Sequence, residues 1–146
     1  MHENILIPGP VTGNIISSLI ETLPNETASG GHSIFLGQVR ADTKGGKTVK
    51  AIEYSAYEPM VKSVAEKILK SIYSEFSDVH KVYIIHSTGR VNAGGISLLV
   101  LVSAGHRQQA ITACSRIVEM IKESLPVWKK EIFIDDTHEW IGNNLA

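Results

Sequence analysis

The sequence predicts an α+β fold with a ferredoxin-like split βαβ core, in which strand, helix, strand, strand, helix and strand follow in order. Two observations support this prediction. Apolar residues switch between strand and helix periodicity in that order from residue 48 onward. The chain has 146 residues, of which 43% are hydrophobic and 20% charged, which is typical of a globular protein. We therefore predict a single domain over residues 1–146.

An extra N-terminal strand and a short helix are predicted ahead of this core. Between Asn14 and Leu23 apolar residues recur at helical spacing, and Pro24 ends the pattern. Residues 32–40 are rich in strand formers, and the polar residues 41–47 predict an exposed loop.

The core elements have recognisable boundaries. Glu58-Pro59 predicts a helix start, because proline fits the first helical turn, and Pro126 ends the second core helix. The apolar run 96–102 does not alternate, which is typical of a central strand buried on both faces. In chain order the predicted core comprises a strand through Val49, Ile52 and Tyr54, a helix over 58–76, a strand over 79–87, a loop over 89–95, a strand over 96–102, a helix from about 106 to 125 and a strand over 127–134.

Charge and composition exclude several classes of protein. Fourteen basic residues face fifteen acidic ones, for a formal net charge of -1, which argues against nucleic-acid binding by bulk electrostatics. The N-terminus has no basic region followed by a long apolar stretch, so no signal peptide is predicted. The longest apolar run is far too short to span a bilayer. We expect a soluble cytoplasmic protein without membrane contact.

The cysteine and the histidines predict no metal site and no cofactor. The single cysteine, Cys114, falls within the apolar stripe of its predicted helix, which favours a buried core thiol over a nucleophile. His80 and His86 are an even number of residues apart on one predicted strand, hence on one face, but no third ligand lies at a useful spacing.

Three residues are candidates for binding an anion. His106 and Arg107 stand at the start of the second core helix, where free N–H groups and a guanidinium would attract a phosphate or carboxylate. An equally good interpretation is that His106 caps the helix and Arg107 points into solvent. Arg40, at the end of the extra strand, is the third candidate.

Lysines near the C-terminal end are the other polar signal. Lys122 lies at the border of a buried helical stripe, where a lone lysine usually keeps its amine in water. Lys129 and Lys130 follow Pro126 on the last strand and must point to opposite faces. The pattern does not decide which of them enters a pocket, and the pair equally suits an edge strand protected against aggregation.

Five stretches of the chain, in the right order, make a specific match to a known family. The sequence resembles the large, catalytic subunit of molybdopterin synthase, the MoaE family, from about His32 to Glu131. The matching stretches are Phe35-Leu36-Gly37-Gln38-Val39-Arg40, Glu53-Tyr54-Ser55-Ala56-Tyr57-Glu58-Pro59-Met60, Ile85-His86-Ser87-Thr88-Gly89-Arg90, Ser103-Ala104-Gly105-His106-Arg107, and Met120-Ile121-Lys122 through Pro126-Val127-Trp128-Lys129-Lys130-Glu131.

This resemblance implies an activity and partners. The family converts cyclic pyranopterin monophosphate into molybdopterin by inserting two sulfurs as a dithiolene, a step of molybdenum cofactor biosynthesis. The sulfur arrives as a thiocarboxylate on the C-terminal Gly-Gly tail of a small ubiquitin-like subunit. The resemblance also implies a homodimer of the large subunit within a heterotetramer.

The resemblance assigns roles to the candidate residues. It implies that Lys122 and Lys129 are catalytic and substrate-binding, and that Arg40, His106 and Arg107 line the anion pocket. We expect Lys129 and not Lys130 to face the cleft, and the three anion-binding residues to converge there, within one chain or across a dimer interface. A non-catalytic binding module and a purely structural dimer subunit are the competing interpretations, and the presence of both lysines favours the enzyme.

Overall fold

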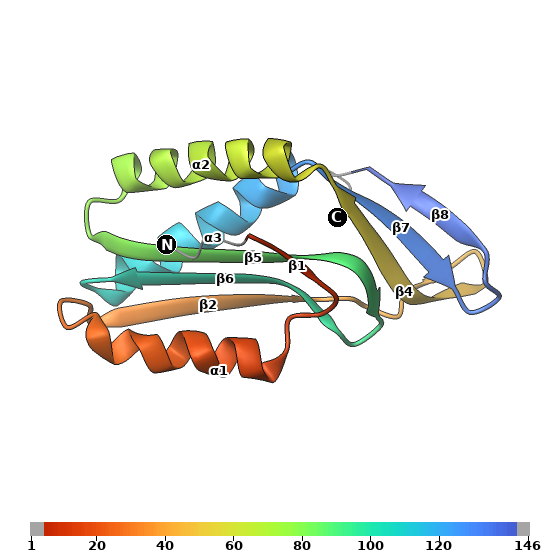
Figure 1. Ribbon diagram of the computed structural model, residues 1–146, viewed down its shortest axis with the longest axis horizontal. Coiled ribbons are helices and arrows are strands. Elements are labelled where there is room, and N and C mark those ends of the chain that lie inside the picture. Colours follow the sequence, from red (N-terminus) through yellow and green to blue (C-terminus); the bar gives the residue numbers. More distant parts are fainter. Residues whose placement is uncertain (1–4, 143–146) are drawn as a thin grey trace.

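The computed structural model describes residues 5–142 and contains three α-helices and eight strands there. Figure 1 shows one extended sheet with helices on both faces. The elements are β1 (Leu6–Pro8), α1 (Gly13–Thr22), a 3₁₀ turn (Leu23–Asn25), β2 (Gly31–Gln38), β3 (Thr43–Lys44), β4 (Lys47–Ala56), α2 (Glu58–Glu75), β5 (Val79–Asn92), β6 (Ile96–Ala104), α3 (Arg107–Ser124), β7 (Val127–Phe133) and β8 (His138–Ile141).

Local sequence explains where the helices begin. Thr12 precedes α1, and its Oγ1 accepts a hydrogen bond from the backbone N–H of Ile15 at 3.4 Å, as expected of an N-cap threonine. In α2, Pro59 lies in the first turn, where its missing N–H removes no helical hydrogen bond. Both helices begin within one residue of their predicted starts.

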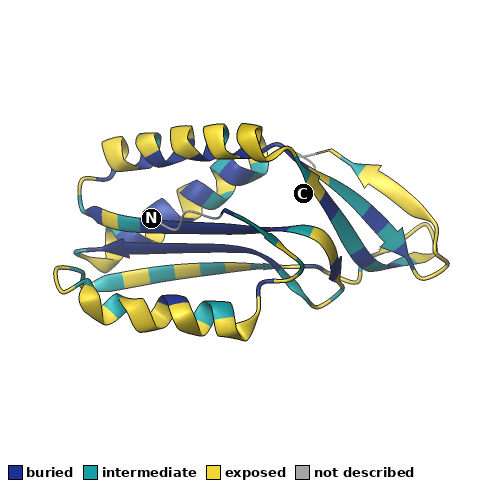
Figure 2. Cartoon of the chain, viewed as in Figure 1, coloured by how far each residue is buried: buried dark blue, intermediate teal, exposed yellow. Residues whose placement is uncertain are grey.

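Two hydrophobic cores lie on opposite faces of the sheet. Helices α2 and α3 cover one face and α1 covers the other (Figure 1). Alternate residues of β5 pack into the two cores. Val82 and Ile84 lie in the core under α2 and α3, and Tyr83 and Ile85 lie in the core under α1. Strand β6 is buried along almost its whole length (Figure 2), which confirms the predicted central strand.

The strand order is β2-β6-β5-β4-β7-β8, with β1 parallel to β5 and β3 paired with β4. Strand β5 joins the two halves of the sheet. Its first part pairs with β6 up to His86, and its last part, from Gly89 to Asn92, pairs with β4. Gly89 has φ +75°, so the strand bends at a residue that tolerates this conformation.

The structure confirms the predicted α+β class, the order of the core elements, and the extra strand and helix in front. It differs in the pairing, because β4 and β5 are adjacent and antiparallel, whereas a split βαβ unit has another strand between them. The predicted loop over 89–95 is shorter, since β5 continues to Asn92. Strands β1, β3 and β8 are additions to the predicted elements.

Candidate functional site

An open cleft of about 630 Å³ lies where the end of β2, the strands β4 and β7 and the C-terminal end of α3 meet. This volume is typical of a small-molecule site. Six charged side chains line it, four cationic and two anionic, for a formal excess of two positive charges. They are Arg40, Lys44, Lys122, Lys129, Asp42 and Glu131.

The junction between α3 and β7 brings Lys122 and Lys129 together. Helix α3 ends at Ser124 because Pro126 forces the preceding residue, Leu125, into an extended conformation with ψ 121°. The backbone N–H of Val127 then donates to the carbonyl of Leu125 at 2.8 Å, which closes a tight turn. The chain turns at this junction, and both lysines line the same cleft.

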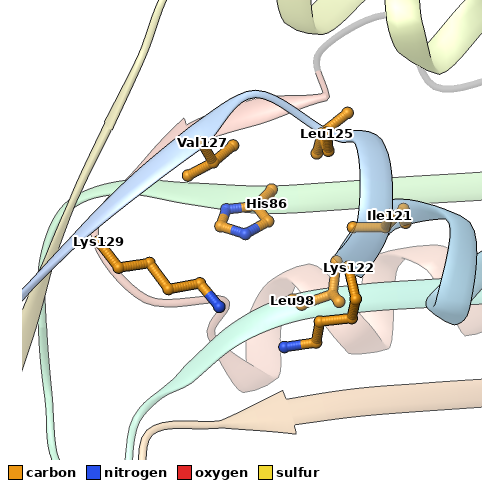
Figure 3. Close-up of a pocket in the computed structure, with 7 residues that line it drawn as sticks. All are labelled: His86, Leu98, Ile121, Lys122, Leu125, Val127 and Lys129. Carbon is orange, nitrogen blue, oxygen red and sulfur yellow. The ribbon is translucent and has the colours of Figure 1, made fainter. Parts of the chain in front are cut away.

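The two lysines lie in unequal electrostatic environments. Figure 3 shows their amine ends directed toward each other. Burial is the main cause that lowers the pKa of Lys129 to about 8, and the nearby charge of Lys122 lowers it further. Lys129 is therefore mostly protonated below pH 8, and it loses its proton far more readily than an ordinary lysine.

No carboxylate neutralises this pair directly. Among residues 5–142, neither Lys122 nor Lys129 lies within ion-pair distance of an acidic side chain. Lys122 is in the last turn of α3, where the helix dipole favours a cation. The pair therefore presents positive charge to an anion bound in the cleft.

Lys130 points away from this site, as expected from strand alternation. Its Nζ lies 3.8 Å from Oε1 of Glu53 and 5.5 Å from the ring centroid of Trp140. Lys129, Glu131 and Phe133 share the opposite face of β7. The structure thus places Lys129, and not Lys130, in the cleft, in agreement with the prediction.

Other charged groups at the cleft rim are already paired. Arg40 is exposed and its Nη2 lies 3.3 Å from Oδ2 of Asp42. Lys44 donates to Oε1 of the buried Glu131 at 2.8 Å, across the strands β3 and β7. Residues 41–47 were predicted to form an exposed loop, yet through Lys44 this segment contributes to the cleft.

His106 and Arg107 do not line this cleft. They lie at the start of α3, while Lys122 lies 15 residues beyond Arg107 on the same helix, a separation of roughly 22 Å at the usual rise per residue. The prediction that they converge with Arg40 is therefore wrong within a single chain, because α3 is too long. Convergence across two chains stays a prediction.

The N-terminus of α3 already carries a carboxylate. Oδ2 of Asp78 accepts hydrogen bonds from the backbone N–H of His106 at 2.8 Å and from its ring Nδ1 at 3.1 Å. This contact lowers the pKa of Asp78, with the side-chain bond to His106 as the main cause. The His106 side chain makes no capping bond itself, and Arg107 is exposed.

His86 and Tyr54 are site residues that the sequence reasoning missed. Both are buried and line the cleft, and their rings meet edge to face with centroids 5.1 Å apart. Burial is the main cause that lowers the pKa of His86 to about 4, so the ring is neutral. The sequence does contain a signal for His86, namely a histidine within the apolar run of β5. Its spacing to His80 led us to consider it only as a metal ligand.

Cys114 is a buried core thiol, as predicted. Its side chain lies in the core between α3 and the sheet, and Sγ contacts the carbonyl oxygen of Val100 at 3.8 Å. Burial raises the pKa of the thiol. This cysteine is poorly suited to act as a thiolate nucleophile.

His80 is exposed, whereas His86 is buried. Within residues 5–142 no group of three or more His, Cys, Asp or Glu side chains is arranged to hold a metal ion. In the same described range no helix is long and apolar enough to cross a membrane.

Comparison with known proteins identifies the family. The family model described as "MoaE protein" matches residues 12–124. The molybdopterin synthase catalytic subunit of Dictyostelium discoideum is 40% identical over 121 residues, which are 82% of this chain and 76% of that protein. That of Pyrococcus abyssi is 37% identical over 136 residues, covering 93% of this chain and 88% of that one. The chain belongs to the MoaE family.

Solved structures agree with this membership. A crystal structure of molybdopterin synthase from Staphylococcus aureus has a TM-score of 0.84 and 32% identity, covering 97% of this chain and 98% of that one. A complex of subunits 1 and 2 of the molybdopterin-converting factor from Helicobacter pylori has a TM-score of 0.77 at 20% identity, covering 92% of this chain and 87% of that one, which shows the fold alone.

The family match covers most of the candidate site. Arg40, His106, Arg107 and Lys122 lie within residues 12–124, whereas Lys129 lies beyond them. The resemblance stated from the sequence is confirmed for the family, and the roles of the individual residues remain predictions.

Proposed function

We propose that this MoaE-family chain is a sulfurtransferase, the catalytic subunit of a molybdopterin synthase. It transfers sulfur from the C-terminal thiocarboxylate of a small ubiquitin-like subunit to cyclic pyranopterin monophosphate, forming the dithiolene of molybdopterin. The observation that carries the proposal is the pair of Lys122 and Lys129 in a positively charged cleft, with the pKa of Lys129 lowered to about 8.

The unequal lysines suit two different roles. A neutral amine at near-physiological pH can take up a proton or attack a carbonyl carbon, and we assign this role to Lys129. A charged amine beside it can hold the thiocarboxylate and stabilise a developing oxyanion, and we assign this role to Lys122. Arg40, at the rim, can contact the substrate phosphate after exchanging its partner Asp42.

The buried cysteine supports a separate sulfur carrier. Cys114 has a raised pKa and lies in the core, so a persulfide on this side chain would not reach the cleft. The sulfur must therefore arrive on another molecule. The Helicobacter pylori complex of two subunits is consistent with a small partner in this fold.

A second copy of the chain belongs to the proposal. Arg107 and His106 lie too far from Lys122 to act on the same substrate within one chain. In a homodimer, which forms a heterotetramer with two small subunits, the N-terminal end of α3 from one chain can complete the cleft of the other. Arg107 and His106 of the second chain would then add positive charge to the cleft near Arg40, where the substrate phosphate would bind.

Reconstitution tests the proposal. The purified chain is incubated with the thiocarboxylated small subunit and cyclic pyranopterin monophosphate, and the dithiolene product is measured by mass spectrometry. The same small subunit with an ordinary C-terminal carboxylate is the control. Binding of both components without product would leave only a binding module.

A further inference from the structure

A small, partly open cavity of about 20 Å³ is lined by the two lysines and the ring of His86 (Figure 3). Its polar lining consists of His86, Lys122 and Lys129, and the other lining residues are aliphatic. Figure 3 shows one ring edge of His86 turned toward the two amines. The function proposed above gives this ring no role.

The tautomer of His86 follows from its hydrogen bond. Its Nδ1 lies 2.8 Å from the carbonyl oxygen of Ser87, and a carbonyl only accepts, so Nδ1 carries the hydrogen. Nε2 is then an unprotonated acceptor. The neighbouring Tyr54 holds the ring from another side, with an interplanar angle of 79°, and its hydroxyl donates to Oγ of Ser97 at 3.0 Å.

The cavity has the size and polarity that one water molecule requires. A buried water needs at least about 10–15 Å³ and two to four polar partners. Lys122 and Lys129 supply donors, and Nε2 of His86 supplies an acceptor. A water placed here accepts from an amine and donates to Nε2, so every group keeps a compatible partner.

We propose that this cavity binds one ordered water, which connects Nε2 of His86 to the amines of Lys122 and Lys129, and that His86 is thereby a positioning residue for Lys129. The part that concerns catalysis rests on the proposed function. The titratable groups facing His86 are Tyr54 from β4, Lys122 from α3 and Lys129 from β7. The neutral ring does not take the proton itself, because its pKa is well below that of Lys129.

Two substitutions separate this role from packing. His86→Gln keeps an acceptor close to the place of Nε2, whereas His86→Leu fills the space without one. The same changes at the exposed His80 of the same strand are the matched controls. Proteins are compared by pH-dependent acetylation of Lys129, quantified by mass spectrometry without any substrate, and by kcat and KM in the reconstituted reaction.

We expect His86→Leu to move the titration midpoint of Lys129 downward, because its ammonium loses an acceptor. We also expect kcat, compared at a pH above both midpoints where Lys129 is neutral in each protein, to fall roughly ten- to a hundredfold with little change in KM. His86→Gln should stay close to wild type in both measurements, as should the His80 variants. An unchanged Lys129 midpoint and kcat in a folded His86→Leu protein would overturn the proposal. Equal losses in His86→Gln and His86→Leu would also overturn it, because they would reduce the role of His86 to packing.

A crystal structure of the wild-type chain at high resolution provides the independent test, which does not depend on any variant folding. One ordered water between the three groups supports the proposal, and a dry cavity contradicts it. Neither the crystal structure nor the acetylation profile requires the enzyme to convert substrate. Failure of the proposed enzyme activity would therefore be distinguishable from failure of the water site.

Discussion

At the scale of single residues, the lowered pKa of Lys129 has a direct kinetic consequence. Its amine is mostly protonated below pH 8 and mostly neutral above it. If the neutral form reacts, kcat rises with pH, by up to about tenfold per pH unit below 8, and levels off above about 8. Rates of dithiolene formation from about pH 6 to 9.5 check this prediction.

The control for this profile is Lys130, which lies on the other face of β7. Lys130→Ala should show the wild-type midpoint. Lys129→Arg, which stays charged throughout, should be inactive at every pH. A rate that is flat or falls as the pH rises toward 8 is incompatible with a neutral Lys129 amine.

Cys114 provides the second residue-scale prediction. Because its thiol is buried and its pKa raised, Cys114→Ala should retain sulfur transfer and lose only about 1 kcal/mol of stability, as for other small core truncations. Urea unfolding and the product assay measure the two quantities. A well-folded but inactive Cys114→Ala protein would indicate that Cys114 carries the transferred sulfur, contrary to the proposal.

At the scale of elements, the bend in β5 lets one strand serve both halves of the sheet. Gly89 has φ +75°, and a Cβ added at this position would meet no atom within 4 Å. Gly89→Ala should therefore lower the free energy of unfolding through backbone strain alone, by about 1–2 kcal/mol. Urea unfolding measures the change.

Gly13 is the matched control for Gly89. A Cβ there also meets open space, but Gly13 lies in α1 and has no positive φ. Gly13→Ala should change stability by less than about 0.5 kcal/mol. Equal effects of the two substitutions would mean that the bend at Gly89 carries no special strain.

The sequence predicted the long elements well, because helical spacing and proline boundaries are local signals. It missed β1, β3 and β8, which have two to four residues each and exist only through pairing with distant or neighbouring strands. It also ended β5 too early, since the glycines suggested a loop, whereas Val91 is fully buried.

The candidate site was predictable in part for the same reason. Pro126 predicts a turn after α3, and strand alternation places Lys129 and Lys130 on opposite faces, but this pattern alone does not decide which of the two lies beside Lys122. The length of α3 likewise separates Arg107 from Lys122, and this separation can be read from the helical spacing. The role of His86 depends on its contacts with Tyr54 and Ser87, and such contacts leave no local pattern in the sequence.

At the scale of the whole molecule, the distance between the two ends of α3 makes a prediction about assembly. If Arg107 acts in the cleft of a second chain, Arg107→Ala and Lys129→Ala proteins should each be nearly inactive. After mixing and chain exchange, about half of the dimers contain one intact site. Activity should then recover to roughly a quarter of wild type.

The product assay on the mixture measures this recovery, and each variant mixed with itself is the control. No recovery, with mass spectrometry showing that mixed dimers have formed, would place Arg107 outside the cleft. The positive charge of this cleft would then come from Arg40 and the lysines of one chain.

The central claim is that the two cleft lysines perform sulfur transfer, and dithiolene formation by three lysine variants tests it most directly. Lys122→Ala and Lys129→Ala should each fold, bind the thiocarboxylated small subunit and lose at least about 99% of product formation. Lys130→Ala should keep most of its activity. Near-wild-type turnover in both Lys122→Ala and Lys129→Ala would contradict the account and leave only a binding module.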